Sequence, residues 1–196
     1  MIRHGQTDWN VAHKIQGSRD IPLNETGRQQ AQALARAMSS RPVTGIFSSP
    51  QKRAADTAKA IGSSQGVPVI SIPQLAEISY GSWEGRTLED IFTNERELYE
   101  QWWRHPDTVA PPGGETLSAV EKRCATAWGM IKSAMTGDAA VVSHGGTLAY
   151  FIGLLLGDLE LAKGLSAKNA SITTVEYEPG AQYCRLIGLN DSSHLL

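Results

Sequence analysis

Two His-Gly pairs in this chain carry groups that suit phosphate chemistry. The first belongs to Arg3-His4-Gly5 and the second is His144-Gly145. An uncharged imidazole can attack a phosphoryl group, while a neighbouring guanidinium binds two phosphate oxygens with its planar fork. The pairs therefore favour phosphoryl chemistry, although Arg-His-Gly by itself would also fit an exposed basic turn after a strand.

The elements that would position these groups follow an α/β pattern. Short apolar runs alternate with longer segments of helical periodicity, which predicts a three-layer α/β/α sandwich with a mainly parallel central sheet. Strands are expected over 43–47, 67–72 and 139–143, with a closing hairpin formed by 171–177 and 183–189. Only Met1 and Ile2 precede the first triplet, so the first strand should be very short.

Helices are expected over 24–38, from about 50, from 87 towards 104, over 116–135 and over 148–156. Ser49, followed by Pro50, can cap the second of these, which places Arg53 in its first turn. The segment from His105 to Gly114 contains three prolines and two glycines, so it should form a loop beside the site. The last residues are expected to be a tail.

The chemistry-bearing residues fall where strands end. Ligands of open α/β sheets bind beyond the carboxyl ends of the strands, and Arg3-His4, Ser48-Ser49 and His144-Gly145 all follow such ends. The start of the helix that carries Arg53 would add free backbone N–H groups and partial positive charge. These groups could converge on one anion; the alternative for Arg53 is an exposed charge on its helix.

Composition limits the class of protein. With 196 residues and 41% hydrophobic content, the chain should form one globular domain over 1–196, with a small helical cap at about 78–115. A net charge of -2 disfavours nucleic acid or an anionic membrane as partner. No signal peptide or membrane span is evident, so we expect a cytoplasmic protein. Cys124 and Cys184 should be reduced thiols, with a single disulfide as the alternative.

Several motifs occur in a fixed order along nearly the whole chain. They are Arg3-His4-Gly5-Gln6-Thr7 with Trp9-Asn10, Asp20 to Gly27, Ser48-Ser49-Pro50 with Arg53, Leu75-Ala76-Glu77 with Gly81 and Trp83-Glu84-Gly85, Pro112 to Glu115, and Ser143 to Gly146. This order resembles the histidine phosphatase superfamily, whose fold is phosphoglycerate mutase-like. A resemblance over so many ordered motifs is specific.

The resemblance implies a metal-independent phosphatase without a cofactor, acting on a small phosphomonoester. His4 would become phosphorylated, and water would then release phosphate. Arg3, Arg53 and His144 would hold the transferring phosphoryl group, with the Asn10 amide beside them. Gln16, Gly17 and Gly145 are expected to bind substrate or phosphate as well. The sequence leaves the oligomeric state open, with a homodimer as one option.

Glu77 matches the family's proton donor to the leaving oxygen, which later acts as base toward water. Glu84, seven residues on, is the competing carboxylate; a solvated turn charge is its plainer interpretation. Tyr99 and the pair Trp102-Trp103 are expected mainly to pack a helix against the core, with lining of a leaving-group pocket as the alternative.

Three other functions are weighed against the phosphatase. Phosphoglycerate mutases of this family carry an Arg-Arg pair in a longer cap, whereas this chain has only Arg86, Arg96 and Arg104, so a bidentate carboxylate clamp is missing. A zinc site of two histidines and a carboxylate is disfavoured by the nearby arginines. An inactive phosphate-binding module is disfavoured because every motif residue is present.

Overall fold

The computed structural model describes residues 1–196. The six strands are β1 (Ile2–Arg3), β2 (Gly45–Ser48), β3 (Val69–Ser71), β4 (Ala139–Ser143), β5 (Ile172–Glu176) and β6 (Arg185–Asp191). The helices are α1 (Asp8–Val11), α2 (Glu25–Met38), α3 (Lys52–Gln65), α4 (Leu88–Asn94), α5 (Arg96–Arg104), α6 (Leu117–Ala134) and α7 (Gly145–Leu156). Short 3-10 turns cover Pro73–Leu75, Gly81–Trp83, Leu159–Lys163 and Ser193–Leu195.

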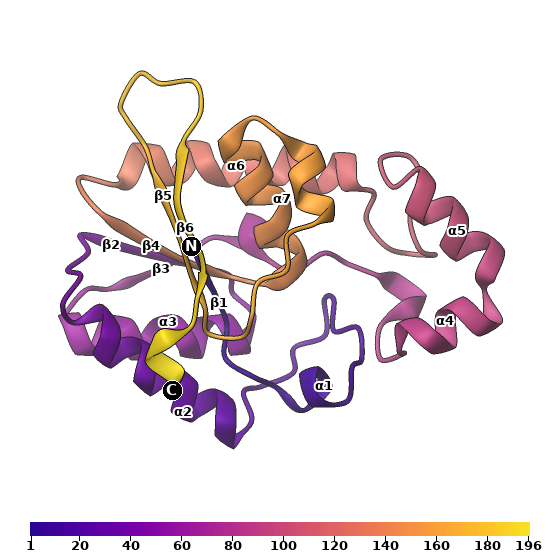
Figure 1. Cartoon of the computed structure of the whole chain (residues 1–196), viewed down its shortest axis with the longest axis horizontal. Coiled ribbons are helices and arrows are strands. Elements are labelled where there is room, and N and C mark those ends of the chain that lie inside the picture. Colours follow the sequence, from indigo (N-terminus) through magenta and orange to yellow (C-terminus); the bar gives the residue numbers. More distant parts are fainter.

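The strands form one sheet in the order β3-β2-β4-β1-β5-β6. The first four run parallel, and β5 and β6 add an antiparallel hairpin at the β1 side. Helices α2 and α3 cover one face of this sheet and α6 and α7 the other (Figure 1). The predicted three-layer sandwich with a mainly parallel sheet is confirmed.

Alternating side chains on the central strands build a separate core on each face. Ile46 and Val142 pack in the cluster toward α2 and α3, whereas their neighbours Phe47 and Val141 pack in the cluster toward α6 and α7. Successive strand residues point to opposite faces, so a run that is apolar at every position fits a strand covered on both sides. The short uninterrupted apolar runs of the sequence therefore specify the middle layer.

The start of α3 differs from the prediction. Its N-cap is Gln51 without a side-chain hydrogen bond, so the expected cap at Ser49 and first helical position at Pro50 are wrong. Ser49 instead prolongs the pairing of β2 with β4, because its N–H donates to the Val142 carbonyl at 3.0 Å. Arg53 nevertheless lies in the first turn of α3, as predicted.

The single helix expected from 87 towards 104 is divided at Glu95. This residue has φ -135° and ψ 39°, which lie outside the helical region. Its carboxylate accepts a hydrogen bond from Trp83 Nε1 at 2.9 Å and also pairs with Arg86. These tertiary contacts outweigh local helix propensity. Helices α4 and α5 form a lobe at one side of the sandwich, called here the α4–α5 lobe (Figure 1).

The first strand is as short as predicted, with two residues. Contacts outside its ladder hold the chain beyond it. The His4 N–H donates to the Ser143 carbonyl at 3.1 Å, and the His4 carbonyl accepts from Asn169 Nδ2 and from the Ala170 N–H, each at 3.1 Å. The Gly5 N–H donates to Thr57 Oγ1 at 3.1 Å. The position of His4 therefore depends on several loops as well as on strand pairing.

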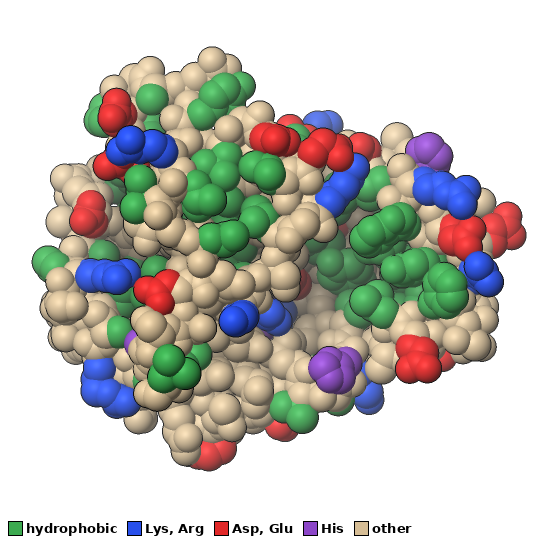
Figure 2. All heavy atoms as spheres, viewed as in Figure 1, with side chains coloured by type: hydrophobic (Ala, Val, Ile, Leu, Met, Phe, Trp, Pro, Cys, Tyr) green, Lys and Arg blue, Asp and Glu red, His purple; other side chains and the backbone are tan.

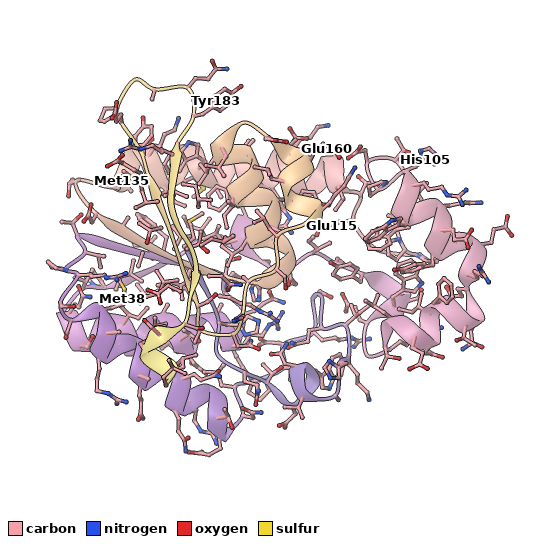
Figure 3. All side chains as sticks on the ribbon, in the orientation of Figure 1. Met38, His105, Glu115, Met135, Glu160 and Tyr183 are labelled. Carbon is pink, nitrogen blue, oxygen red and sulfur yellow. The ribbon has the colours of Figure 1, made fainter.

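The predicted closing hairpin is present as β5 and β6. The connection between them, which carries Tyr183, extends away from the sandwich (Figure 3). The expected C-terminal tail is wrong: the turn Ser193–Leu195 packs against α2. Cys124 and Cys184 are both free thiols. No helix has the length and apolar character required to cross a membrane.

Two glycines bring the loop after His4 into backbone contact with the start of α2. A Cβ atom on Gly27 would lie 2.0 Å from the Gln6 carbonyl oxygen, and one on Gly5 would lie 2.4 Å from the Gly27 carbonyl oxygen. Neither backbone can yield as a flexible side chain would. Glycine is therefore required at both positions by close approach.

We expect Gly27→Ala to destabilise the fold by about 1–3 kcal/mol, because the added methyl group must displace backbone. The matched control is Gly129→Ala on α6, where a Cβ atom would meet nothing within 4 Å. That change should stabilise the protein by about 0.5–1 kcal/mol through helix propensity. Thermal or urea unfolding measures both, and similar effects of the two substitutions would contradict the argument.

Candidate active site

The carboxyl end of β1 borders a cavity of about 240 Å³, and the ends of β2 and β4 lie beside it in the sheet. Its lining contains seven of the nine residues predicted for the site: Arg3, His4, Asn10, Gln16, Gly17, Arg53 and Glu77. His144 is fully buried directly behind it, and Gly145 lines a neighbouring cavity. The three strand ends are neighbours as predicted, but of the predicted pairs only Arg3-His4 lines this cavity, and Ser48-Ser49 is buried away from it.

His4 presents an uncharged nitrogen to this cavity. Its Nδ1 donates to the Gly5 carbonyl at 2.6 Å, which leaves the Nε2 lone pair free. Burial lowers the pKa of His4 well below 6.5, and the positive charges of Arg3 and Arg53 lower it further. The geometry and the electrostatics both favour the neutral, nucleophilic form of the ring.

Arg53 is completely buried, which excludes its alternative interpretation as an exposed helix charge. Its Nε donates to His144 Nδ1 at 3.1 Å, Nη1 to the Arg19 carbonyl at 2.7 Å and Nη2 to the Gly17 carbonyl at 3.0 Å. A guanidinium has five N–H donors, so two remain for a ligand. Burial lowers the pKa of Arg53, an effect that the charge of Glu77 opposes.

Arg3 supplies a second source of unpaired donors. Its Nη1 donates to the Ala167 carbonyl at 2.6 Å, whereas its buried Nε has no partner. An unpaired N–H of a buried cation costs free energy that a bound anion would recover. Both arginines line the cavity and keep donors that have no partner in the protein.

His144 lies against His4, with the ring centroids 5.1 Å apart. Its Nδ1 accepts from Arg53, so Nε2 carries the proton and donates to Ser49 Oγ at 2.8 Å. Burial lowers the pKa of His144 well below 6.5, with smaller effects from nearby positive groups. Both ring nitrogens are thus engaged within the protein, and direct contact with a phosphoryl group would require the bond to Ser49 to exchange.

The carboxylate of Glu77 is held by the start of α7. Oε1 accepts from the Thr147 N–H at 2.9 Å, and Oε2 accepts from the Gly146 N–H at 3.2 Å.

At the start of α3, the Lys52 N–H donates to Asp20 Oδ1 at 2.7 Å. The expectation that the start of α3 offers free N–H groups to the ligand is therefore wrong at Lys52, because a carboxylate of the protein already occupies that position.

Glu84 is neither a solvated turn charge nor free to act on a substrate. Its side chain is 3% exposed. Its Oε1 accepts from the Ser18 N–H at 2.7 Å and from the Tyr80 N–H at 3.2 Å. It thereby fixes the loop whose Gly17 carbonyl binds Arg53, a structural role that its sequence motif did not reveal.

Lys14, which lines the cavity, and Asn169, which lies behind Asn10, escaped prediction. Asn169 Nδ2 donates to Asn10 Oδ1 at 3.2 Å and to the His4 and Gly5 carbonyls. Asn10 Oδ1 also accepts from the Thr7 N–H at 3.0 Å, which leaves the Asn10 amide nitrogen for the cavity. Asn169 belongs to no periodic pattern, so the sequence offered no signal for it.

The aromatic residues of the α4–α5 lobe and of the turn Gly81–Trp83 are arranged differently from the prediction. Trp83 is the fully buried member, whereas Trp103 is 62% exposed, so the expected core packing is wrong for Trp103. Trp102 lies edge-on to Trp83, with ring centroids 5.4 Å apart, and lines the cavity beside His4. The lobe has a small aromatic core of its own, centred on Trp83.

A second cavity of about 340 Å³ adjoins the first and shares Arg3, Tyr80 and Trp102 with it. Figure 2 shows a hollow between the α4–α5 lobe and the rest of the protein, with hydrophobic side chains gathered on the lobe side. Apart from Pro106, the proline- and glycine-rich loop does not line either cavity; the Pro112 carbonyl instead accepts from the Ser82 N–H at 3.0 Å. The expectation that this loop borders the site is therefore largely wrong.

The zinc alternative lacks a ligand set. No group of three or more histidine, cysteine, aspartate or glutamate side chains is placed to hold a metal ion. The two arginines bring positive charge to the same cavity, which opposes cation binding further.

The chain is similar to known proteins along most of its length. The histidine phosphatase superfamily (branch 1) matches residues 1–190. The chain is 31% identical over 180 residues to the probable phosphoglycerate mutase GpmB of Yersinia pestis, covering 91% of this chain and 84% of that protein.

Two solved structures are also similar to this fold. The mycobacterial glucosyl-3-phosphoglycerate phosphatase in complex with VO3 has a TM-score of 0.88 and 32% identity, with 98% of each chain covered. The alpha-ribazole phosphatase of Shigella flexneri has a TM-score of 0.86 and 27% identity, covering 97% of this chain and 94% of that one. The family match over residues 1–190 agrees with the site geometry, and the chain belongs to the histidine phosphatase superfamily.

Proposed function

We propose that this protein hydrolyses small phosphomonoesters through a phosphohistidine formed on His4. The observation that carries the proposal is the free Nε2 of a buried, neutral His4 beside two arginines with unpaired donors. Such a site attracts a phosphate dianion and offers it an uncharged nucleophile. Glu77 lines the same cavity and is available for proton transfer.

The reaction takes place in two displacements at phosphorus. In the first, His4 Nε2 forms a bond to phosphorus while the bond to the leaving oxygen breaks, and protonated Glu77 gives its proton to that oxygen. In the second, water attacks the phosphohistidine, Glu77 accepts a proton from the water, and the N–P bond breaks to release phosphate. Arg3 and Arg53 stabilise the charge on the phosphoryl oxygens in both steps.

The cavity beside the catalytic one would receive the leaving group. Ten of its sixteen lining residues are hydrophobic, and Trp102 and Tyr80 stand at its junction with the catalytic cavity. This lining favours a leaving group with an apolar or aromatic part over a small, charged one. We therefore propose a phosphomonoester of a moderately large organic alcohol as substrate.

The phosphoglycerate mutase alternative is favoured by the similarity to the probable mutase of Yersinia pestis. Arg86, Arg96 and Arg104 provide evidence against a mutase, because each is paired with an acidic side chain of the α4–α5 lobe. Arg86 pairs with Asp90, and Arg96 and Arg104 both pair with Glu100. None of the three lines the catalytic cavity or the adjoining one, so none is placed to clamp a substrate carboxylate there, which supports hydrolysis over transfer between glycerate positions.

We expect His4→Ala to lower kcat at least about 10³-fold, because it removes the nucleophile while leaving the arginines in place. Labelled phosphate from substrate should appear on the wild-type chain after an alkaline quench and be absent from the variant. His105→Ala, an exposed residue at the end of α5, serves as the control and should keep full activity. Full activity of His4→Ala would refute the phosphohistidine mechanism.

We expect kcat/KM for phosphate release to be at least about tenfold higher with an aryl phosphate than with 3-phosphoglycerate. This factor corresponds to about 1.4 kcal/mol. The reason is the apolar leaving-group cavity and its lack of a free carboxylate clamp. Trp102→Ala should reduce this preference. Efficient transfer of phosphate between glycerate positions with negligible release would instead identify a mutase.

Protonation of His4 would remove its attacking lone pair. Its pKa lies well below 6.5, so the ring should stay neutral as the pH falls through 6.5. An NMR titration of the labelled ring should show no inflection near that pH. Arg3→Gln removes one of the positive charges that depress the value and should therefore raise it. A His4 resonance that titrates near 6.5 in the wild type would contradict the proposed electrostatics.

A further inference from the structure

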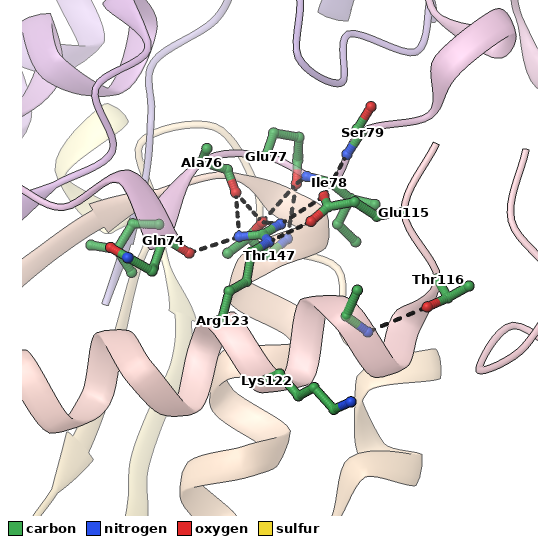
Figure 4. A network of polar contacts seen from close by, with 12 residues as sticks. Gln74, Ala76, Glu77, Ile78, Ser79, Glu115, Thr116, Lys122, Arg123 and Thr147 are labelled. Carbon is green, nitrogen blue, oxygen red and sulfur yellow. Dashed lines mark hydrogen bonds and ion pairs between the residues drawn. The ribbon is translucent and has the colours of Figure 1, made fainter. Parts of the chain in front are cut away.

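We infer that Arg123 and Glu115 are positioning residues for Glu77, so that this pair sets the efficiency of proton transfer to the leaving oxygen. The inference rests on the proposed function of Glu77. Neither residue lines the catalytic cavity. Arg123 binds the segment just before Glu77, and Glu115 binds the segment just after it (Figure 4).

Arg123 binds the chain just before Glu77. It projects from α6, and its side chain is 16% exposed. Its Nη1 donates to the carbonyls of Gln74 and Ala76, at 2.7 Å and 2.8 Å. A single nitrogen thus holds two carbonyls of the segment that leads to Glu77. This fork needs the planar, multiply donating guanidinium, which lysine cannot supply.

Glu115 binds the chain just after Glu77. Its Oε2 accepts from the Ser79 N–H at 2.9 Å, and its own N–H donates to the Ser79 carbonyl at 2.8 Å. Its Oε1 accepts from Arg123 Nε at 2.9 Å. One ion pair therefore connects the segment before Glu77 with the segment after it.

Thr147 links the same pair to the carboxylate of Glu77. Arg123 Nη2 donates to Thr147 Oγ1 at 3.2 Å, and this hydroxyl donates to the Ala76 carbonyl at 2.7 Å. The Thr147 N–H in turn donates to Glu77 Oε1 at 2.9 Å. The backbone of Glu77 and the start of α7 that holds its carboxylate are thus fixed by one guanidinium.

The pair also connects Glu77 to the α4–α5 lobe. Glu115 lies where the chain returns from α5 to the start of α6 (Figure 3). An arginine that served only to pack α6 would bond to neighbouring helices. Arg123 instead donates to backbone carbonyls next to Glu77, the proposed acid. The arrangement therefore fits a role in aiming Glu77, and small displacements of a catalytic group are costly to rate.

The test uses the dependence of rate on the leaving group. An alkyl phosphate needs its leaving oxygen protonated, whereas p-nitrophenyl phosphate has a leaving group that departs without a proton. The constant to compare is kcat/KM, because it reports the first step, in which the leaving group departs. Glu77→Gln provides the reference and should slow the alkyl phosphate far more than the aryl phosphate.

We expect Arg123→Lys and Glu115→Gln to lower kcat/KM for the alkyl phosphate about tenfold or more, a part of the 10²–10⁴ that general acid catalysis contributes. Their effect on p-nitrophenyl phosphate should stay within about threefold, well below the contribution of the acid. Both substitutions keep a similar size, and unfolding temperatures show whether the fold is retained. Lys122→Ala, an exposed neighbour on α6, is the control and should change neither substrate.

Equal losses on the two substrates in Arg123→Lys and Glu115→Gln, with a selective loss in Glu77→Gln, would overturn the positioning role alone. An equal loss on both substrates in Glu77→Gln would overturn the proposed proton donor itself and the positioning role with it. The two failures are therefore distinguishable within one set of measurements.

Discussion

The burial of the Arg53 guanidinium is the constraint on which the site depends. A cation removed from water must be surrounded by hydrogen-bond acceptors, or the cost in free energy is several kcal/mol. Arg53 obtains these acceptors from His144 at the end of β4 and from the Gly17 and Arg19 carbonyls. Three parts of the chain that are distant in sequence must therefore meet around one side chain, and Glu84 holds the loop that supplies two of the acceptors.

The charge of Arg53 also acts on His4, together with the burial of the His4 ring and the charge of Arg3. Burial of the ring, and then the charges of Arg3 and Arg53, lower the pKa of His4 well below 6.5 and favour the neutral ring that the proposed mechanism uses as nucleophile. The positive potential is local, because the whole chain has a net charge of -2. A phosphate dianion would compensate both arginines at once. Nucleophile activation and anion attraction thus come from one arrangement of charges, without a separate base acting on His4.

The layers of the fold and the convergence of the strand ends could be predicted because both follow from short-range rules. Apolar runs such as 139–143 specify strands covered on both faces, and residues after parallel strands must share one edge of the sheet. Other features depend on tertiary partners. Asn169 and Arg123 gain their roles from carbonyls brought to them by folding. Glu95 divides a helix because its carboxylate binds Trp83. Local propensity is decisive only where no tertiary contact opposes it.

The α4–α5 lobe shows how one chemistry can serve proteins named as phosphatases and as mutases. The proposed phosphohistidine step uses Arg3, His4, Arg53 and Glu77, none of which belongs to the α4–α5 lobe. The fate of the phosphoenzyme depends on whether a second substrate can be held against it long enough to compete with water. Here Arg86, Arg96 and Arg104 pair with acidic side chains and line neither cavity, and the adjoining cavity is mainly apolar. Under the proposed function, a mainly apolar cavity retains a charged glycerate poorly, and the proposal therefore assigns water as the acceptor of the phosphoryl group.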